Sequence, residues 1–189
     1  MTDTATRDFQ GVTIPAPGTF TIDPAHTRVG FVARHLMVSK VRGSFTDVSG
    51  EIVIAEEPTA STVNVTIQAA SINTGVEQRD GHLRSGDFLE AETFPTIEFR
   101  STGLTPKGGN EFSLHGELTI KKVTHAVSLD VEFEGLANSP WGKEVIGFSA
   151  TTEIDREAWG MTWNQALETG GVMVGKKIKI EIEAEAVRS

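Results

Sequence analysis

The sequence predicts an all-β protein: a closed antiparallel barrel of about eight strands with one helical insertion. Most of the chain alternates apolar and polar residues with a period of two, which is typical of half-buried strands. The alternating segments are joined by short connections, whereas a parallel sheet would need continuous apolar runs and crossover helices. A length of 189 residues suits one domain, large enough to enclose a core or a cavity.

The N-terminal region differs from this pattern. Residues 1–17 are polar at first and are then interrupted by prolines, so we predict a flexible N-terminal tail that is tethered near Phe9 and Ile14. The barrel domain is expected over residues 18–189, and it begins with a strand over residues 18–23.

The next strand shows the alternation clearly. Over residues 26–35, Val29, Phe31 and His35 share one face, which we expect to point into the barrel. Further alternating segments lie at residues 41–47, 50–55, 61–70, 97–101, 112–120, 127–133, 146–154 and 177–186. The first two of these segments are expected to be joined by a tight turn.

The helical insertion is expected over about residues 74–90. Thr74 and Glu77 have capping-box spacing, in which each side chain satisfies a free backbone amide of the first turn. The residues that then share one helical face are Val76, Arg79, Asp80 and Leu83. Because an isolated helix of this length is marginal in water, we predict that it packs against a barrel end through its apolar residues.

The charged residues of the helix are predicted to be structural. We expect Arg79, Asp80, His82 and Arg156 to form a clasp between the helix and the barrel, because unpaired buried charges would cost several kcal/mol. General acid–base catalysis needs groups that converge on a scissile bond, and nothing in the sequence positions them in that way. We therefore predict no catalytic residue.

The five histidines are the remaining candidates for chemistry. No pair of them has metalloprotease spacing, so we expect no metal and no cofactor; a zinc site assembled from three histidines in space is the less favoured alternative. His35 has two interpretations. It is either a hydrogen-bonded residue at the barrel rim or the partner of a ligand's polar head group.

A barrel of this size is either filled by its own side chains or just wide enough for one ligand. The sequence pattern alone does not separate these alternatives. The residues predicted to line a ligand cavity are Val29, Phe31, His35, Phe45, Val65, Ile67, Phe99, Leu114, Leu118, Phe148, Trp159 and Met161.

Composition restricts the partners and the compartment. Seventeen Lys and Arg against 26 Asp and Glu give a net charge of −9, which opposes binding to nucleic acid and to anionic lipid surfaces, and no run of basic residues concentrates the positive charges. The absence of cysteine excludes disulfides and thiolate chemistry.

The first thirty residues contain no apolar segment of a secretory signal, and no stretch approaches the ~20 apolar residues of a membrane span, so we expect a cytoplasmic protein.

Several motifs resemble those of a known family, the YceI-like family, and the resemblance extends over about residues 18–187. The matching segments are Asp23-x-x-His26-Thr27-x-Val29-x-Phe31-x-x-x-His35, Val41-x-Gly43-x-Phe45, Ser71-Ile72-x-Thr74-Gly75-x-x-x-Arg79-Asp80-x-His82-Leu83-x-x-x-x-Phe88-Leu89, Phe94-Pro95-x-Ile97-x-Phe99-x-Ser101, Leu118-Thr119-Ile120 and Ile154-x-Arg156. The sequence departs from the family at Lys121-Lys122, where members usually have a glycine before Val-Thr.

The resemblance implies an eight-stranded, lipocalin-like barrel with an extended hydrophobic cavity. It also implies non-catalytic binding of an amphiphilic polyisoprenoid, such as an isoprenoid quinone or its precursor, and a possible homodimer. Family members are often periplasmic, which contrasts with the lack of a secretory signal in this sequence.

Three hypotheses for the function follow. The first is storage or transport of an amphiphilic long-chain lipid. The second is an isomerase or hydrolase that acts on an apolar substrate with His35 or His82 and Asp80. The third is a stress-response interaction protein whose barrel interior is packed shut.

Overall fold

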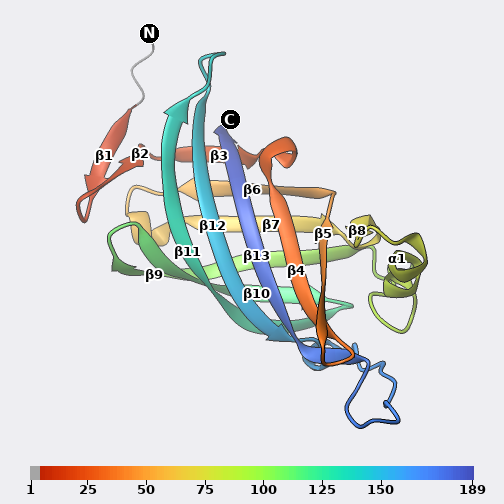
Figure 1. The fold of residues 1–189 in the computed structure, drawn as a ribbon. Coiled ribbons are helices and arrows are strands. Elements are labelled where there is room, and N and C mark those ends of the chain that lie inside the picture. The colour runs from red at the N-terminus through yellow and green to blue at the C-terminus, as the bar shows by residue number, and fades with distance from the viewer. Residues whose placement is uncertain (1–4) are drawn as a thin grey trace.

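The computed structural model describes residues 5–189, which form strands, one α-helix and short 3₁₀ turns (Figure 1). The helix is α1 (Glu77–Arg84). The strands are β1 (Thr6–Phe9), β2 (Val12–Pro15), β3 (Gly18–Ile22), β4 (Arg28–His35), β5 (Ser39–Phe45), β6 (Val48–Ile54), β7 (Thr62–Gln68), β8 (Ile72–Asn73), β9 (Thr96–Gly108), β10 (Glu111–Ile120), β11 (Val123–Asn138), β12 (Glu144–Asp155) and β13 (Val174–Arg188).

Eight strands close into a ring, in the order β12-β11-β10-β9-β7-β6-β3-β13, and the β12–β13 pairing closes it. Every pairing in the ring is antiparallel. One edge of β13 pairs with β12. Its opposite edge is long enough to pair with β4 along its first part and with β3 along its last part, so β4, β5 and β8 extend the wall beyond the ring. The predicted eight-stranded antiparallel barrel is therefore confirmed.

The connection between β5 and β6 differs from the prediction. Residues 46–47 alone join β5 to β6, so the predicted turn is shorter and Gly50 lies within β6. The two strands also pair with different neighbours: β5 pairs with β4 and β8, whereas β6 pairs with β3 and β7. Glycines allow close contacts along this bent stretch. A Cβ atom on Gly43 would lie 2.4 Å from the ring of Phe31, and one on Gly50 would lie 2.4 Å from the backbone oxygen of Asn64.

The predicted flexible tail over residues 1–17 is wrong from Thr6 onward. Residues 1–4 lie outside the described residues, but β1 and β2 form an antiparallel hairpin in which Phe9 pairs with Val12. The hairpin is a separate two-stranded sheet, visible beside the barrel in Figure 1. Phe9 and Ile14, the expected tethers, both line the barrel interior. The apolar residues of this region therefore help to close one end of the barrel.

The helix is shorter than the predicted 74–90. Its N-cap is Val76, whose side chain makes no capping bond, so the expected capping box between Thr74 and Glu77 does not form. Val76 is also 46% exposed and does not pack against the barrel, whereas Leu83 does. Residues 85–94 continue as turns, in which Phe88 and Leu89 are buried.

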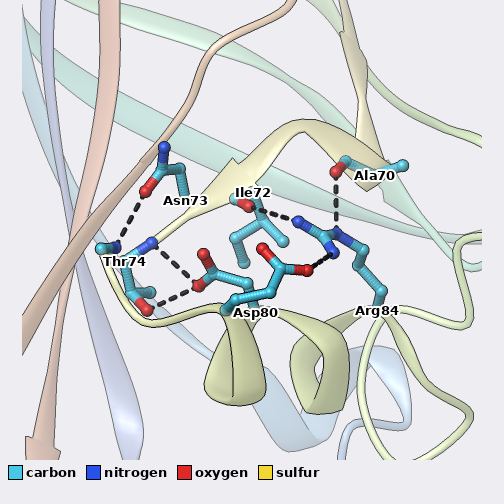
Figure 2. A network of polar contacts seen from close by, with 8 residues as sticks. Ala70, Ile72, Asn73, Thr74, Asp80 and Arg84 are labelled. Atoms are coloured by element: carbon cyan, nitrogen blue, oxygen red, sulfur yellow. Dashed lines mark hydrogen bonds and ion pairs between the residues drawn. The ribbon is translucent and has the colours of Figure 1, made fainter.

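A carboxylate replaces the capping box (Figure 2). Asp80, which is 4% exposed, accepts hydrogen bonds from the backbone amide of Thr74 at 2.9 Å and from the Thr74 hydroxyl. Arg79 donates to the same hydroxyl at 2.7 Å and to the Thr74 carbonyl at 3.0 Å. Arg79 and Asp80 thus meet through Thr74, which fastens α1 to the end of β8.

A second cation, Arg84, fastens the other end of α1, and sequence reasoning missed it. Its guanidinium donates to the carbonyl oxygens of Ala70 at 3.0 Å and Ile72 at 3.5 Å, and it pairs with Glu77 at 3.0 Å (Figure 2).

Within residues 5–189, α1 is the only α-helix, and it is too short and too polar to cross a membrane.

The departure at Lys121-Lys122 lies in the two-residue turn between β10 and β11. Both residues have positive φ, 52° and 62°, a conformation in which glycine is usually preferred. Lys122 places its amine 5.6 Å from the centre of the Phe94 ring. The two lysines therefore adopt the same turn conformation that a glycine would have favoured.

We expect Asp80→Ala to destabilise the protein by about 1–3 kcal/mol, because the Thr74 amide loses its acceptor in a partly buried position. Asp80→Asn, which keeps an acceptor oxygen, should cost less. The matched control is Asp87→Ala, since Asp87 pairs with His82 at an exposed position and such pairs contribute roughly 0–1 kcal/mol. Urea unfolding measures all three variants, and equal losses for Asp80→Ala and Asp87→Ala would contradict the assignment.

Gly116→Ala should cost about 1–3 kcal/mol through overpacking. A Cβ at this position would lie 2.4 Å from the Phe99 ring and 2.6 Å from the backbone oxygen of Arg100. On the adjacent strand, Gly103→Ala brings the new carbon no closer than 3.9 Å to its nearest neighbour, so its stability should change by less than about 0.5 kcal/mol. Thermal unfolding of both variants measures the difference. A Gly116→Ala variant as stable as wild type would contradict the prediction and show that the Phe99 ring can move to make room.

Candidate functional site

The barrel interior holds a cavity of about 380 Å³, which falls within the range of about 300–1,000 Å³ usual for ligand pockets. Phe9 of the β1–β2 hairpin and Asn110 of the β9–β10 turn border one end. Leu83 of α1 and Met161 border the other. The cavity therefore runs along the barrel, and the alternative of an interior packed shut is wrong.

Ten of the residues predicted to line a cavity lie in its wall: Val29, Phe31, Phe45, Val65, Ile67, Phe99, Leu114, Leu118, Phe148 and Met161. Nine of them lie on strands and reach the wall because side chains alternate between the two faces of each strand, whereas Met161 reaches it from the loop after the 3₁₀ turn. The wall is almost entirely apolar.

His35 and Trp159, also predicted to bind a ligand, are not in the wall. His35 is the last residue of β4 and pairs with Val174 and Ser39 where the β4–β5 hairpin extends past the barrel, so the wall ends at Ala33. Trp159 is 3% exposed, donates its indole N–H to the Leu118 carbonyl at 3.0 Å and belongs to the packed core.

Sequence reasoning left many wall residues out of the predicted lining, and two groups of them are instructive. The first is Val12, Ile14 and Phe9 of the N-terminal hairpin, which the prolines nearby made look like part of a tail. The second is the inward face of β13, namely Ile178, Ile180 and Ile182. Their strict alternation with charged residues could have identified them.

Arg156 is the charged residue most deeply placed at the cavity. It begins the 3₁₀ turn Arg156–Trp159, is 2% exposed and borders the cavity. The guanidinium donates to the carbonyl oxygens of Gly175 at 2.9 Å, Met161 at 2.5 Å, Trp163 at 3.0 Å and Val174 at 3.3 Å. Burial lowers the pKa of Arg156, but a guanidinium stays charged at neutral pH.

Among residues 5–189, no carboxylate lies within ion-pair distance of Arg156. The cation is therefore held by carbonyl dipoles from both ends of the loop over residues 160–173. These bonds fold the loop over one end of the cavity and leave a positive charge in an otherwise apolar wall.

Aromatic contacts join this loop to the segment that contains α1. The ring of Trp163 lies 4.6 Å from that of His82 and 5.5 Å from that of Phe88, measured between ring centres. The Arg156 guanidinium carbon lies 5.8 Å from the centre of the Phe88 ring. The helical segment and the loop thus cover the same end of the barrel, and Phe88 links Arg156 to His82.

The residues of the enzyme hypothesis do not meet in the cavity. His82 pairs with Asp87 at 2.8 Å near the surface, Asp80 faces Thr74, and His35 lies beyond the wall. No general acid and base are therefore brought to one place in the cavity by these three residues.

Polar groups in the wall are largely bonded within the protein. The Thr152 hydroxyl donates to the Ser128 carbonyl at 2.8 Å, and the Thr27 hydroxyl exchanges hydrogen bonds with the backbone of Glu185. Asn110 donates to Glu132 and to the Phe133 carbonyl. The wall therefore offers a ligand mainly apolar contact.

Outside the cavity, ligand atoms of Asp23, His26 and Glu185 lie within 4.8 Å of one another at the surface. The hydrogen bond between Asp23 and His26, 2.8 Å long, lowers the pKa of Asp23 and, together with the charge of Glu185, raises the pKa of His26. These groups satisfy one another, and we assign no metal to them.

Comparison with known proteins identifies the family. A UPF0312 protein of Staphylococcus aureus strain N315 is 46% identical over 169 residues, which cover 88% of this chain and 95% of that relative. The Campylobacter jejuni YceI protein has a similar structure, with a TM-score of 0.70 and 32% identity over 82% of this chain and 90% of its own. A polyisoprenoid binding domain from Saccharophagus degradans shares the fold at a TM-score of 0.70 and 14% identity, over 90% and 98% of the two chains.

A model of the YceI-like domain matches residues 20–186, nearly the whole barrel. This match confirms the resemblance carried by the sequence motifs. The chain belongs to the YceI-like family.

Proposed function

We propose that this protein binds an amphiphilic long-chain lipid, a polyisoprenoid or an isoprenoid quinone, in the barrel cavity, and stores or transports it without altering it. The observation that carries the proposal is the long apolar cavity enclosed by the barrel. Family membership and the fold shared with the Saccharophagus degradans domain, which is described as polyisoprenoid binding, support a lipid as the ligand.

The apolar wall supplies the affinity. Each buried CH₂ group contributes about 0.8 kcal/mol, so a prenyl chain along the cavity gains affinity in proportion to the length enclosed. The wall makes few hydrogen bonds available, which favours a hydrocarbon chain over a sugar, a nucleotide or a peptide.

Arg156 is the candidate anchor for the polar head group. Four of the five N–H donors of a guanidinium are used by backbone carbonyls, and one remains on a group that borders the cavity. An oxygen of a quinone or a prenyl head group would accept this bond and also be attracted by the charge. His35, which lies outside the wall, takes no part in this proposal.

The homodimer that the family resemblance implies stays a prediction.

Filling the cavity should weaken lipid binding. Ala150 lies in the wall on β12, and Ala150→Phe occupies room that a ligand would use. Displacing about two CH₂ groups at ~0.8 kcal/mol each should weaken prenyl-chain binding about tenfold. Ala126→Phe is the matched control, because Ala126 is exposed on β11 and does not border the cavity. Displacement of an apolar fluorescent probe by prenyl alcohols measures both.

Native mass spectrometry of the protein purified from its own host should detect a bound lipid. An empty barrel from which prenyl alcohols displace no probe would overturn the proposal. Recovery of a chemically changed lipid after incubation would instead favour an enzyme.

A further inference from the structure

The turn between β4 and β5 carries three apolar side chains into solvent. Leu36 is 37% exposed, Met37 52% and Val38 82%. They lie together at the end of a hairpin that extends past the cavity wall (Figure 1). We call Leu36, Met37 and Val38 the hairpin tip.

The backbone of the tip gives no reason for these residue types. Leu36 and Met37 have φ angles of 52° and 62°, and the Val38 amide donates to the His35 carbonyl at 3.2 Å. Positive φ at both central residues is the requirement of a type I′ turn, which favours Asn-Gly and disfavours bulky side chains. Exposed apolar residues in an unfavourable conformation therefore point to a contact made outside the chain.

The tip is held in place by the loop that covers the cavity end. The Leu36 amide donates to the Met173 carbonyl at 2.8 Å. Met37 lies beside Gly171, so close that a Cβ atom there would be 3.2 Å from the Met37 side chain. Figure 1 shows the tip and this loop, which precedes β13, at the same end of the molecule. The tip is thus presented as a fixed protrusion.

Basic residues flank the tip on β4, β5 and β13, although the whole chain has a net charge of −9 and the loop beside the tip carries one exposed carboxylate, Glu168. Residues 24–46 contain four Lys or Arg, two His and no Asp or Glu. The exposed residues on the outward face next to the tip form what we call the basic collar: Arg34, Lys40, Arg42, Lys177 and Lys179.

The barrel brings this collar together from two distant stretches of sequence, because β13 pairs with β4. Glu181 partly balances the collar, at 3.7 Å from Arg42 and 3.2 Å from Lys179. Further carboxylates begin on β12, where Glu153 stands opposite Lys179 and Asp155 opposite Lys177. Toward the tip itself, every charged residue on the outward face of β4 and β5 is a cation.

We propose that the hairpin tip docks on an anionic lipid bilayer. The three apolar side chains enter the boundary between head groups and acyl chains, and the basic collar faces the phosphates, the combination that surface-binding segments use. A second copy of the chain fits less well, because a three-residue convex tip offers little of the area that a stable protein interface buries. Docking in this way turns the cavity end covered by α1 and residues 160–173 toward the bilayer. The inference goes beyond the proposed function and does not depend on which ligand the cavity takes.

The test is co-sedimentation with vesicles made of equal parts phosphatidylcholine and phosphatidylglycerol, compared with pure phosphatidylcholine vesicles. Leu36→Asn combined with Met37→Gly removes the apolar tip and installs the residues that the turn favours. We expect this variant to lose about tenfold or more in partitioning to the anionic vesicles, with an unchanged or higher melting temperature. Wild-type binding should fall at high salt and be weak on pure phosphatidylcholine.

The matched control is Gln10→Asn in the β1–β2 turn, where Gln10 and Gly11 also have positive φ, 54° and 82°, at the end of the barrel away from the tip (Figure 1). It should bind the anionic vesicles within about twofold of wild type, since it changes no charge and leaves the tip and the collar intact. Equal binding by wild type and the Leu36/Met37 variant would overturn the proposal. So would equal binding to both kinds of vesicle. A wild-type dimer that the Leu36/Met37 variant dissociates, with vesicle binding unchanged, would assign the tip to self-association instead. Ligand content of the purified protein is scored separately, so an empty cavity leaves this test intact.

Discussion

The pairing of β12 with β13 is the constraint on which the rest of the structure depends. Its register runs without interruption from Val145 opposite Val187 to Asp155 opposite Lys177. This pairing turns a row of strands into a ring, and only a ring can surround an apolar space without leaving open sheet edges in its wall. The inward faces of the strands then meet across the cavity instead of packing against a second layer.

Alternation made much of this architecture predictable. A period of two fixes which residues of a strand share a face, so residues such as Phe31, Leu114 and Phe148 could be placed on the inner wall from the sequence. The pattern does not say where a strand leaves the wall. His35 continues the inward phase of β4 but lies beyond the barrel, and Trp159 is buried without reaching the cavity.

The remaining errors came from local rules that tertiary contacts overrode. Prolines in the first seventeen residues suggested a tail, yet apolar residues there close one end of the cavity. Thr74 and Glu77 do have the capping-box spacing, but the Thr74 amide donates to Asp80 instead, and the helix begins at Glu77. The gathering of cations from β4, β5 and β13 could not be foreseen, because it depends on strand pairing between distant segments.

The way Arg156 is bonded also determines how the loop over residues 160–173 responds to acid and base. Its acceptors are backbone carbonyls, which do not titrate, and a guanidinium keeps its proton across the range in which proteins remain folded. An ion pair with Asp or Glu at the same place would weaken as the carboxylate became protonated. The four bonds from Arg156 to the two ends of this loop therefore keep nearly the same strength in an acidic compartment as in a neutral one.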